Sequence, residues 1–129
     1  MKPDTIVAVI TCGRKVLFIC RGPSVVEAGY WAPLSGKIEP GERQEAAVIR
    51  EVKEEVGLSV RPLRKVWENI SSSGDQTLHW WLAEYVEGAL TLDPREASDA
   101  RWVTVDEIDD LHPTFAGDRA FFQQVYTRL

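Results

Sequence analysis

Three glutamates lie on one face of a predicted helix. From Glu42 to Val56 the sequence has no glycine or proline, and its composition favours a helix that ends at Gly57. A helix advances by about 100° per residue. If Glu51 is placed at zero, Glu54 falls at about −60° and Glu55 at about +40°. The three carboxylates therefore share one stripe of the helix surface.

An aliphatic arc runs beside the glutamates. It covers about 60° to 160° on the same scale and consists of Val48, Val52, Val56 and Ile49. We expect this arc to pack against a sheet, which places the glutamates at the edge of the buried face. The small side chain of Ala47, near about −40°, leaves the space between Glu51 and Glu54 unobstructed.

Grouped carboxylates repel one another and need a compensating charge. Each like-charge pair at helical spacing costs about 0.2–0.5 kcal/mol in an isolated helix, and partial burial raises that cost. Divalent cations with all-oxygen ligands, Mg²⁺ or Mn²⁺, meet this need best. The alternative is a solvated acidic face with Arg50 and Lys53 as partners, and such faces are common. Spacing alone leaves both interpretations open.

A phosphorylated ligand would also need cations and flat apolar surfaces. Arg21 and Lys37 are the best-placed cations for pyrophosphate oxygens, with a surface role as the alternative for each. Trp31 and Trp81 offer faces on which a base could stack, although core packing is the favoured role of any single aromatic side chain. Neighbouring strand residues point to opposite faces, so Trp80 and Trp81 cannot both meet one ligand.

The elements that must position these residues alternate between strands and helices. Apolar runs predict a covered sheet, and the two helical segments complete an α/β sandwich. The strands are expected at Thr5–Thr11, Lys15–Arg21, Trp31–Leu34, Leu58–Ile70, Thr77–Val86 and Ala100–Val105, with a turn-rich stretch at Ser35–Gly41, an acidic helical turn at Asp106–Leu111 and a second helix at Asp118–Arg128.

Composition bounds the class of protein. With 129 residues, 44% of them hydrophobic, we expect one domain over residues 1–129 with a core of its own. The net charge of −5 argues against binding a nucleic-acid polymer. Cys12 and Cys20 would not face each other in a hairpin, and no signal peptide or membrane span is evident, so we expect reduced thiols and a cytoplasmic location.

The stretch from Gly36 to Leu58 resembles a complete Nudix box. The pattern G-x5-E-x7-R-E-U-x-E-E-x-G-U, with U aliphatic, matches at all nine specified positions. The order of the flanking strands extends the resemblance over nearly the whole chain. It implies a MutT-like hydrolase with a mixed β-sheet sandwiched between helices, which cleaves the pyrophosphate link of a nucleoside diphosphate joined to another group and uses Mg²⁺ or Mn²⁺.

The resemblance also implies roles for residues inside the box. Glu51, Glu54 and Glu55 would be metal ligands, and Arg50 would hold the carboxylates in place by an ion pair. Glu42 would tie the loop to the start of the helix. Gly36, Gly41 and Gly57 would serve the tight loop and the helix end.

Two further positions lie outside the box, Ser35 directly before it and Glu96 farther along the chain. Family members often read Leu-Pro-Gly-Gly before the helix, where this chain has Pro33-Leu34-Ser35-Gly36. Ser35 would give its main-chain carbonyl to a metal, under strain if the position needs a positive φ. Glu96 lies six residues before Trp102, a spacing at which the family often has a glutamate that acts as metal ligand or general base. A solvated loop charge is the alternative for Glu96.

These features are compatible with two functions. The first is metal-dependent hydrolysis, and the second is a non-catalytic Nudix-like sensor that binds a nucleotide without turnover. All box glutamates are present, and we expect no room for an appended DNA-binding segment, so the enzyme is favoured. Subfamily markers for ADP-ribose, dinucleoside polyphosphates and coenzyme A are absent, which leaves a nucleoside triphosphate as the expected substrate. The sequence leaves the oligomeric state of the protein open between monomer and homodimer.

Overall fold

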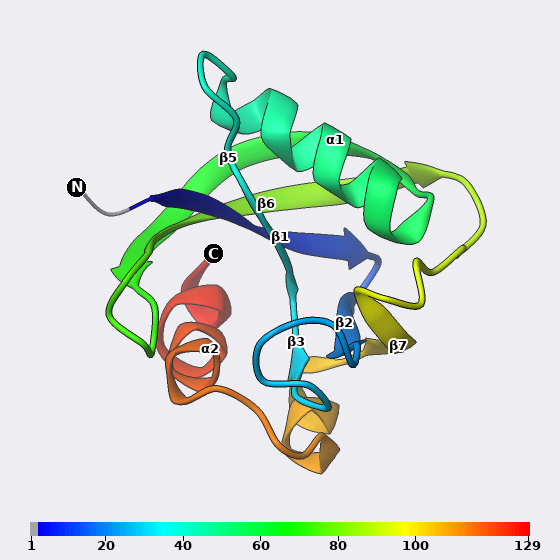
Figure 1. The fold of residues 1–129 in the computed structure, drawn as a ribbon. Coiled ribbons are helices and arrows are strands. Elements are labelled where there is room, and N and C mark those ends of the chain that lie inside the picture. The colour runs from blue at the N-terminus through cyan, green and yellow to red at the C-terminus, as the bar shows by residue number, and fades with distance from the viewer. Residues whose placement is uncertain (1–2) are drawn as a thin grey trace.

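A seven-stranded mixed sheet forms the centre of the structure, a computed structural model that describes residues 3–129 (Figure 1). The strand order is β3-β2-β1-β6-β5, with β4 also beside β1 and β7 also beside β2. β1 and β6 run parallel, whereas the other pairs are antiparallel. The strands are β1 (Asp4–Cys12), β2 (Lys15–Arg21), β3 (Trp31–Ala32), β4 (Leu34–Lys37), β5 (Ser59–Ile70), β6 (Thr77–Glu87) and β7 (Ala97–Val103).

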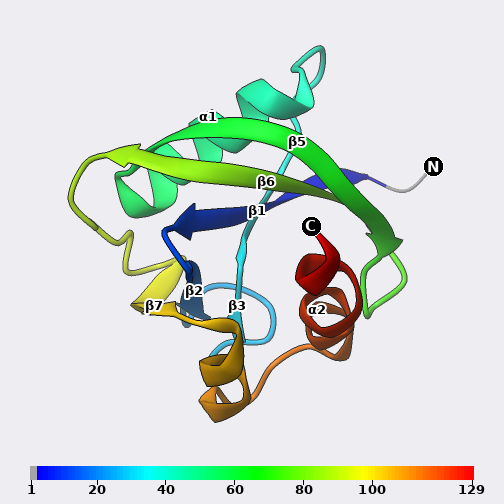
Figure 2. The same cartoon turned by 180° about the vertical axis from the view of Figure 1, so that it is seen from behind.

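Helices lie on both sides of this sheet. One face is covered by α1, and the other by the C-terminal helical segment, as the two opposite views show (Figures 1 and 2). The helical elements are α1 (Gln44–Val56), η1 (Val105–Asp110), α2 (Ala116–Ala120), η2 (Phe121–Val125) and η3 (Tyr126–Arg128). The predicted α/β fold, a mixed sheet between helices, is confirmed.

The central strand β1 is buried on both faces, as its apolar run predicts. Ile6, Ala8 and Ile10 face the core beneath α1, whereas Val7 and Val9 face a second core with the aromatic side chains of the C-terminal segment. Strand geometry explains this division because successive side chains point to opposite faces. Two apolar cores therefore hold the sheet in place from both sides.

The chain changes strand partner at Pro33, which places the box beside β1. A single strand was expected from Trp31 to Leu34, followed by a turn-rich stretch. Instead β3 pairs with β2 and β4 pairs with β1, so Ser35, Gly36 and Lys37 are part of a strand. Proline lacks an N–H group for a sheet ladder, which suits a point where the chain leaves one partner for another.

Helix α1 begins two residues later than predicted, at Gln44, because Glu42 belongs to the loop. Gly57 ends the helix in the left-handed conformation with φ of 75°, and its N–H donates to the carbonyl of Lys53. The buried side chains are Ala47, Val48, Val52 and Val56. Ile49 was expected among them but is 46% exposed. The buried arc is thus rotated toward Ala47, and Glu51 and Glu55 fall inside it rather than at its edge.

The C-terminal half keeps the predicted order with shifted bounds. β7 begins at Ala97 instead of Ala100, because pairing with β2 extends past the register shift at Cys20 and Arg21. The predicted helix at Asp118–Arg128 begins at Ala116 and is divided into α2, η2 and η3. The edge strand β5 has three irregularities in its pairing with β6.

Both cysteines are free, as expected from their positions in the hairpin. Cys12 lies opposite Lys15, and Cys20 lies opposite Trp31 and Asp99. Among the helices of residues 3–129, none has the length and apolar character that crossing a membrane requires.

Candidate active site

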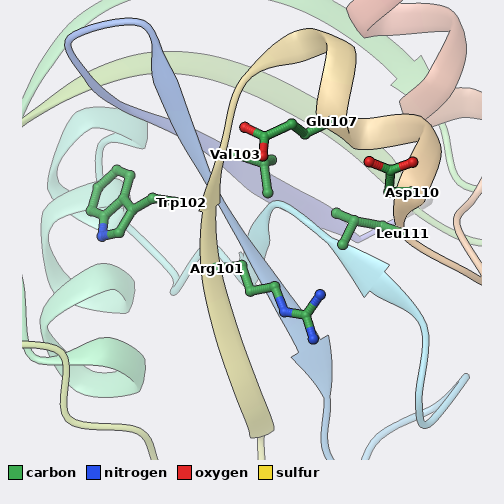
Figure 3. A pocket seen from close by; sticks show the side chains of 6 residues that line it. All are labelled: Arg101, Trp102, Val103, Glu107, Asp110 and Leu111. Atoms are coloured by element: carbon green, nitrogen blue, oxygen red, sulfur yellow. The ribbon is translucent and has the colours of Figure 1, made fainter.

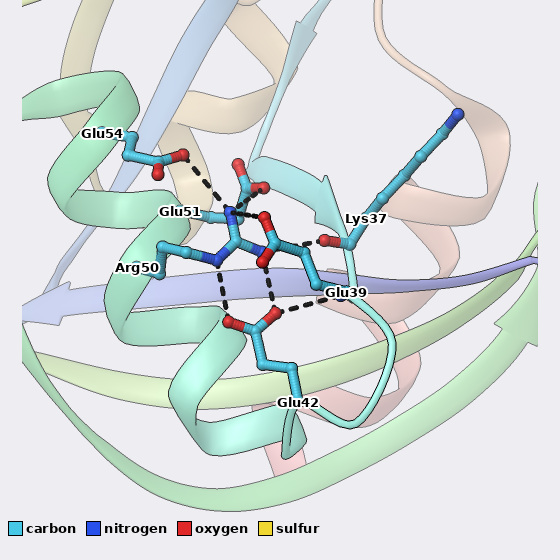
Figure 4. A network of polar contacts seen from close by, with 6 residues as sticks. All are labelled: Lys37, Glu39, Glu42, Arg50, Glu51 and Glu54. Carbon is cyan, nitrogen blue, oxygen red and sulfur yellow. Dashed lines mark hydrogen bonds and ion pairs between the residues drawn. The ribbon is translucent and has the colours of Figure 1, made fainter.

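Arg50 is the centre of a polar network that joins α1 to the preceding loop (Figure 4). Its Nε and Nη2 donate to the two oxygens of Glu42, each at 2.8 Å, and Nη2 also donates to the carbonyl of Lys37 at 3.0 Å. Its Nη1 donates to Glu51 at 2.9 Å and to Glu54 at 3.3 Å. The ion pairs lower the pKa of Glu42 to about 2 and raise that of Arg50. Arg50 therefore fixes the loop and two of the three glutamates in one arrangement.

Gly36 allows α1 to approach β4 closely. A Cβ atom at this position would lie 2.1 Å from Cδ and 2.4 Å from Oε2 of Glu51. Neither Gly36 nor Ser35 has a positive φ, so the glycine is needed for space and the backbone strain considered for Ser35 is not found. The carboxylate of Glu51 thus rests directly on the backbone of β4.

The three glutamates that the box places on α1 have different environments. Burial raises the pKa of Glu55 to about 8, and the negative charges of Glu51, Glu96 and Asp93 act in the same direction. Burial also raises the pKa of Glu51, an effect that Arg50 opposes. The side chain of Glu54 is 59% exposed. Their positions on α1 explain the difference because Glu51 and Glu55 lie between Ala47 and Val48 on the buried arc.

Glu96 joins this acidic cluster from the segment before β7. The N–H of Asp93 donates to the carbonyl of Glu55 at 3.1 Å, and the N–H of Gly22 donates to the carbonyl of Glu96 at 2.8 Å. The charge of Glu96 contributes to the raised pKa values of both Glu51 and Glu55. The structure therefore brings Glu96 to the same side of the site as the helix glutamates.

The oxygen donors of this cluster fit a hard divalent cation, but they are not arranged as a finished metal site. Among residues 3–129 no three His, Cys, Asp or Glu side chains converge in a way that would hold a metal ion. Glu51 and Glu54 instead both accept hydrogen bonds from Nη1 of Arg50. Glu55, half-buried and surrounded by other carboxylates, lacks a compensating cation of comparable proximity. An oxygen-binding cation such as Mg²⁺ or Mn²⁺ suits this donor set.

The two predicted phosphate-binding cations differ in position. Arg21 lies at the end of β2, where its Nε donates to the carbonyl of Val26 at 2.7 Å. Its positive charge opposes the rise in the pKa of both Glu55 and Asp118, so it lies near enough to act on these two carboxyl groups. The side chain of Lys37 points away from the Arg50 network (Figure 4). Arg21 is therefore the cation better placed beside the cluster.

Both predicted stacking residues pack against the cores of the sheet, Trp31 fully and Trp81 in part. Trp31 is only 9% exposed and packs in the second core, with the guanidinium of Arg101 over its ring at 4.9 Å. Trp81 packs against the core beneath α1, and its Nε1 donates to Gln44 at 2.9 Å. Core packing explains both side chains, and Trp80 points to the opposite face as expected.

Sequence reasoning missed a carboxyl group near Arg21. Burial raises the pKa of Asp118 to about 7, against the smaller opposing effects of Arg21 and Arg119, with no hydrogen bond contributing. Arg21 also lies over the ring of Phe115 at 5.8 Å, and Phe115 contacts Tyr30 with ring centroids 4.7 Å apart. No local spacing marks Asp118, because only the return of α2 toward β2 brings it to this place.

A surface hollow of about 300 Å³ lies elsewhere, between β7 and η1 (Figure 3). Its lining residues are Arg101, Trp102, Val103, Glu107, Asp110 and Leu111. It includes none of the box residues. The acidic cluster is therefore distinguished by its chemistry and not by the size of a cavity.

A comparison with family models matches residues 1–125 to the NUDIX domain. The chain belongs to the Nudix family. The match contains the whole box, so Arg50 and the glutamates occupy the positions that define the family. Nudix hydrolases generally use divalent metal ions, in agreement with the oxygen-rich character of the cluster.

Curated Nudix relatives are longer proteins. One, from Pseudomonas entomophila, is named NAD-capped RNA hydrolase NudC and is 35% identical over 113 residues, which cover 88% of this chain and 39% of the relative. A relative of the same name from Deinococcus radiodurans is 33% identical over 111 residues, with 86% and 39% covered. The chain spans about 39% of the length of these relatives.

Solved Nudix structures match over nearly the full chain. A MutT Nudix hydrolase from Burkholderia pseudomallei is 26% identical with a TM-score of 0.78, covering 97% of this chain and 98% of that one. A MutT protein from Methanosarcina mazei has a TM-score of 0.83 at 23% identity, with 98% and 94% covered. The second likeness supports the fold alone.

Proposed function

We propose that this chain is a metal-dependent pyrophosphohydrolase that cleaves the phosphoanhydride of a nucleoside diphosphate linked to another group. The observation that carries the proposal is the acidic cluster at the Nudix box, where the charges of Glu51 and Glu96 add to the raised pKa of the buried Glu55 and Arg50 holds the loop beside them. Such a concentration of carboxylates is costly without a cation, and a substrate rich in phosphate would be repelled without one. Metal-dependent phosphate chemistry accounts for both facts.

Glu51, Glu54 and Glu55, with the main-chain carbonyl of Ser35, would hold the cation. Bound Mg²⁺ or Mn²⁺ would supply Lewis-acid neutralisation of phosphate charge and a lowered pKa for water. Arg50 would keep its two bonds to Glu42 and its bond to the Lys37 carbonyl, so the loop stays in place while Glu51 and Glu54 serve the cation.

Glu96 is the proposed general base or additional ligand. It approaches the cluster from the segment before β7, so it could act on a water molecule while α1 keeps its own glutamates in place.

The remainder of the substrate is proposed to extend past Arg21. Its charge acts on both Glu55 and Asp118, and it is suited to bind phosphate oxygens of a substrate held at the cluster. Phe115 and Tyr30 provide aromatic surface beyond it. The carboxylate of Asp118 would accept hydrogen bonds from N–H groups of a base. A nucleoside triphosphate is the proposed substrate.

The names of the curated relatives add a second substrate to the test. NAD-capped RNA contains a pyrophosphate link, which is the class of bond proposed here. The net charge of −5 predicts weak binding of a nucleic-acid polymer. NAD and NAD-capped RNA therefore belong beside nucleoside triphosphates in the same experiment.

The test is a product-resolved screen of the purified protein with Mg²⁺ or Mn²⁺. The panel contains nucleoside triphosphates, NAD, NAD-capped RNA, nucleotide sugars, ADP-ribose and dinucleoside polyphosphates. We expect cleavage of a pyrophosphate link that EDTA abolishes and that Glu55→Gln lowers, while the exposed helix variant Lys53→Met retains it. Tight nucleotide binding without turnover would instead support the alternative, a non-catalytic sensor.

A further inference from the structure

A second polar cluster lies at the beginning of β1, apart from the acidic site. It consists of Asp4, Lys65, Glu68 and His79. The side chain of His79 on β6 is 9% exposed and lies between charged groups of β1 and β5. Its Nε2 is 2.9 Å from Asp4 Oδ1, and its Nδ1 is 2.8 Å from Lys65 Nζ and 3.1 Å from Glu68 Oε1. A buried imidazole thus has partners at both ring nitrogens.

The chemistry of these partners determines where the ring carries hydrogen. A carboxylate only accepts hydrogen bonds, so Nε2 must carry a hydrogen to bind Asp4. An ammonium only donates, so the neutral ring must leave Nδ1 free to accept from Lys65. A protonated ring has a second N–H at Nδ1, and Glu68 is in position to accept it. Lys65 is therefore the partner of Nδ1 in the neutral ring and Glu68 its partner in the protonated ring. The bond from Nε2 to Asp4 is present in both states.

Asp4 connects this cluster to the Nudix box. Its main-chain carbonyl accepts a hydrogen bond from the N–H of Ile38 at 3.1 Å, directly after β4 ends. In the same ladder Thr5 pairs with Lys37, whose carbonyl accepts the bond from Arg50. The ladder β1–β4 fixes the strand against which Glu51 rests. A side chain that holds Asp4 therefore bears on the position of Arg50 and Glu51.

We propose that His79 is a positioning residue for the Nudix box, which acts through Asp4 and is kept in the Nε2–H form by Lys65. The charged groups facing its ring are Asp4 from β1 and Lys65 and Glu68 from β5. The expected effect on metal affinity rests on the proposed function, whereas the expected effect on amide hydrogen exchange at Ile38 does not. We call the hydrogen bond from Nε2 of His79 to Asp4 the anchor. As long as Lys65 is present, the anchor forms whether the imidazole is neutral or protonated.

The decisive variant is Lys65→Met, with Arg64→Met on the same strand as its matched control. Without Lys65 the neutral ring can move its hydrogen to Nδ1 and donate to Glu68, which leaves Nε2 without a hydrogen for Asp4. A protonated ring carries both hydrogens, so the anchor returns. The defect of Lys65→Met should therefore be present where the ring is neutral and absent where it is protonated, which a purely structural loss would not produce.

Three measurements on the full chain test this. Ring ¹⁵N shifts report the tautomer and charge of His79, with His112→Gln assigning the only other histidine. Amide hydrogen exchange of Ile38 reports the anchor without metal, and Mn²⁺ titration reports the site. In Lys65→Met, at a pH where the ring is neutral, we expect an Nδ1–H population, several-fold faster exchange at Ile38 and a several-fold larger Mn²⁺ Kd than in Arg64→Met. At a pH where the ring is protonated these ratios should return toward one.

The outcomes separate the two proposals. An Nδ1–H tautomer in the wild-type protein, or Ile38 exchange in Lys65→Met that equals the control at both pH values, would overturn the positioning role. Faster Ile38 exchange by an equal factor at both pH values would reduce the role of His79 to a structural contribution and also overturn the proposal. Failure of the wild-type protein to bind Mn²⁺ would contradict the proposed function, while the tautomer and exchange results would still decide the role of His79.

Discussion

Replacing Gly36 by alanine should damage the site far more than the fold. The added Cβ would lie 2.1 Å from Cδ and 2.4 Å from Oε2 of Glu51, whereas carbon atoms in contact are about 3.5–4 Å apart. The carboxylate of Glu51 must therefore move by more than about 1 Å. That movement strains or breaks the 2.9 Å bond from Arg50, and a charge-assisted hydrogen bond is worth about 1.5–3 kcal/mol.

The expected cost in stability is about 1–3 kcal/mol, because the displaced group is the end of one side chain. Misplacement of a functional group by about 1 Å can cost about a hundredfold in rate, so we expect a loss of turnover of that order with weaker Mn²⁺ binding. Urea denaturation, Mn²⁺ titration and initial rates on the best substrate measure the three effects.

Gly74→Ala provides a matched control. Gly74 lies in the loop between β5 and β6 with φ of 81° and no atom within 4 Å of an added Cβ. Alanine in this left-handed conformation costs about 1–2 kcal/mol through backbone strain alone. The two variants should therefore have similar stability but different activity. Wild-type turnover and Mn²⁺ affinity in Gly36→Ala would refute the close contact as a requirement of the site.

Three further predictions address carboxylates one at a time. Glu54→Gln should leave the fold intact and lower turnover at least about a hundredfold, and a wild-type initial rate would remove Glu54 from the proposed ligands. Glu96→Gln should lower kcat by about 10²- to 10⁴-fold with stability changed by less than about 0.5 kcal/mol; rescue by higher Mg²⁺ would identify a ligand, and loss of the acidic limb of the pH profile a base. Burial raises the pKa of Asp118 to about 7, so the folded state keeps a proton that the unfolded state releases, and wild-type stability should fall as the pH rises from about 4 to about 7. The raised pKa of Glu55 contributes a fall of the same sign, so Asp118→Asn should reduce the difference between urea midpoints at pH 5 and pH 8 without abolishing it, and an unchanged difference would contradict the raised pKa of Asp118.

The sequence by itself determined the box and most of the elements around it. Helical periodicity placed Glu51, Glu54 and Glu55 on one stripe of α1, because residues three and four positions apart lie on the same side of a helix with 3.6 residues per turn. The two-sided apolar run of β1 predicted a covered central strand, and Gly57 predicted the end of α1. These features depend on contacts within a few residues or on composition, which a single sequence records.

The depth of the glutamates required the tertiary structure. An isolated pattern ranked Ile49 as buried and the glutamates as peripheral, but the orientation of α1 on the sheet rotated the buried arc toward Ala47. Glu55 thereby became half-buried while Glu54 stayed exposed. Helix orientation is decided by packing against β1, β4 and β5, and no helical period contains that information.

Associations between distant segments were also decided only by the fold. Pro33 transfers the chain from β2 to β1, so Ser35 and Gly36 lie in a strand and not in a turn. Asp118 reaches Arg21 because the C-terminal segment returns across the sheet, and His79 meets Asp4 because β1 and β6 pair in parallel. Residues separated by more than 70 positions share these contacts. Sequence spacing cannot specify them, because they depend on the order and register of strands that only the assembled sheet defines.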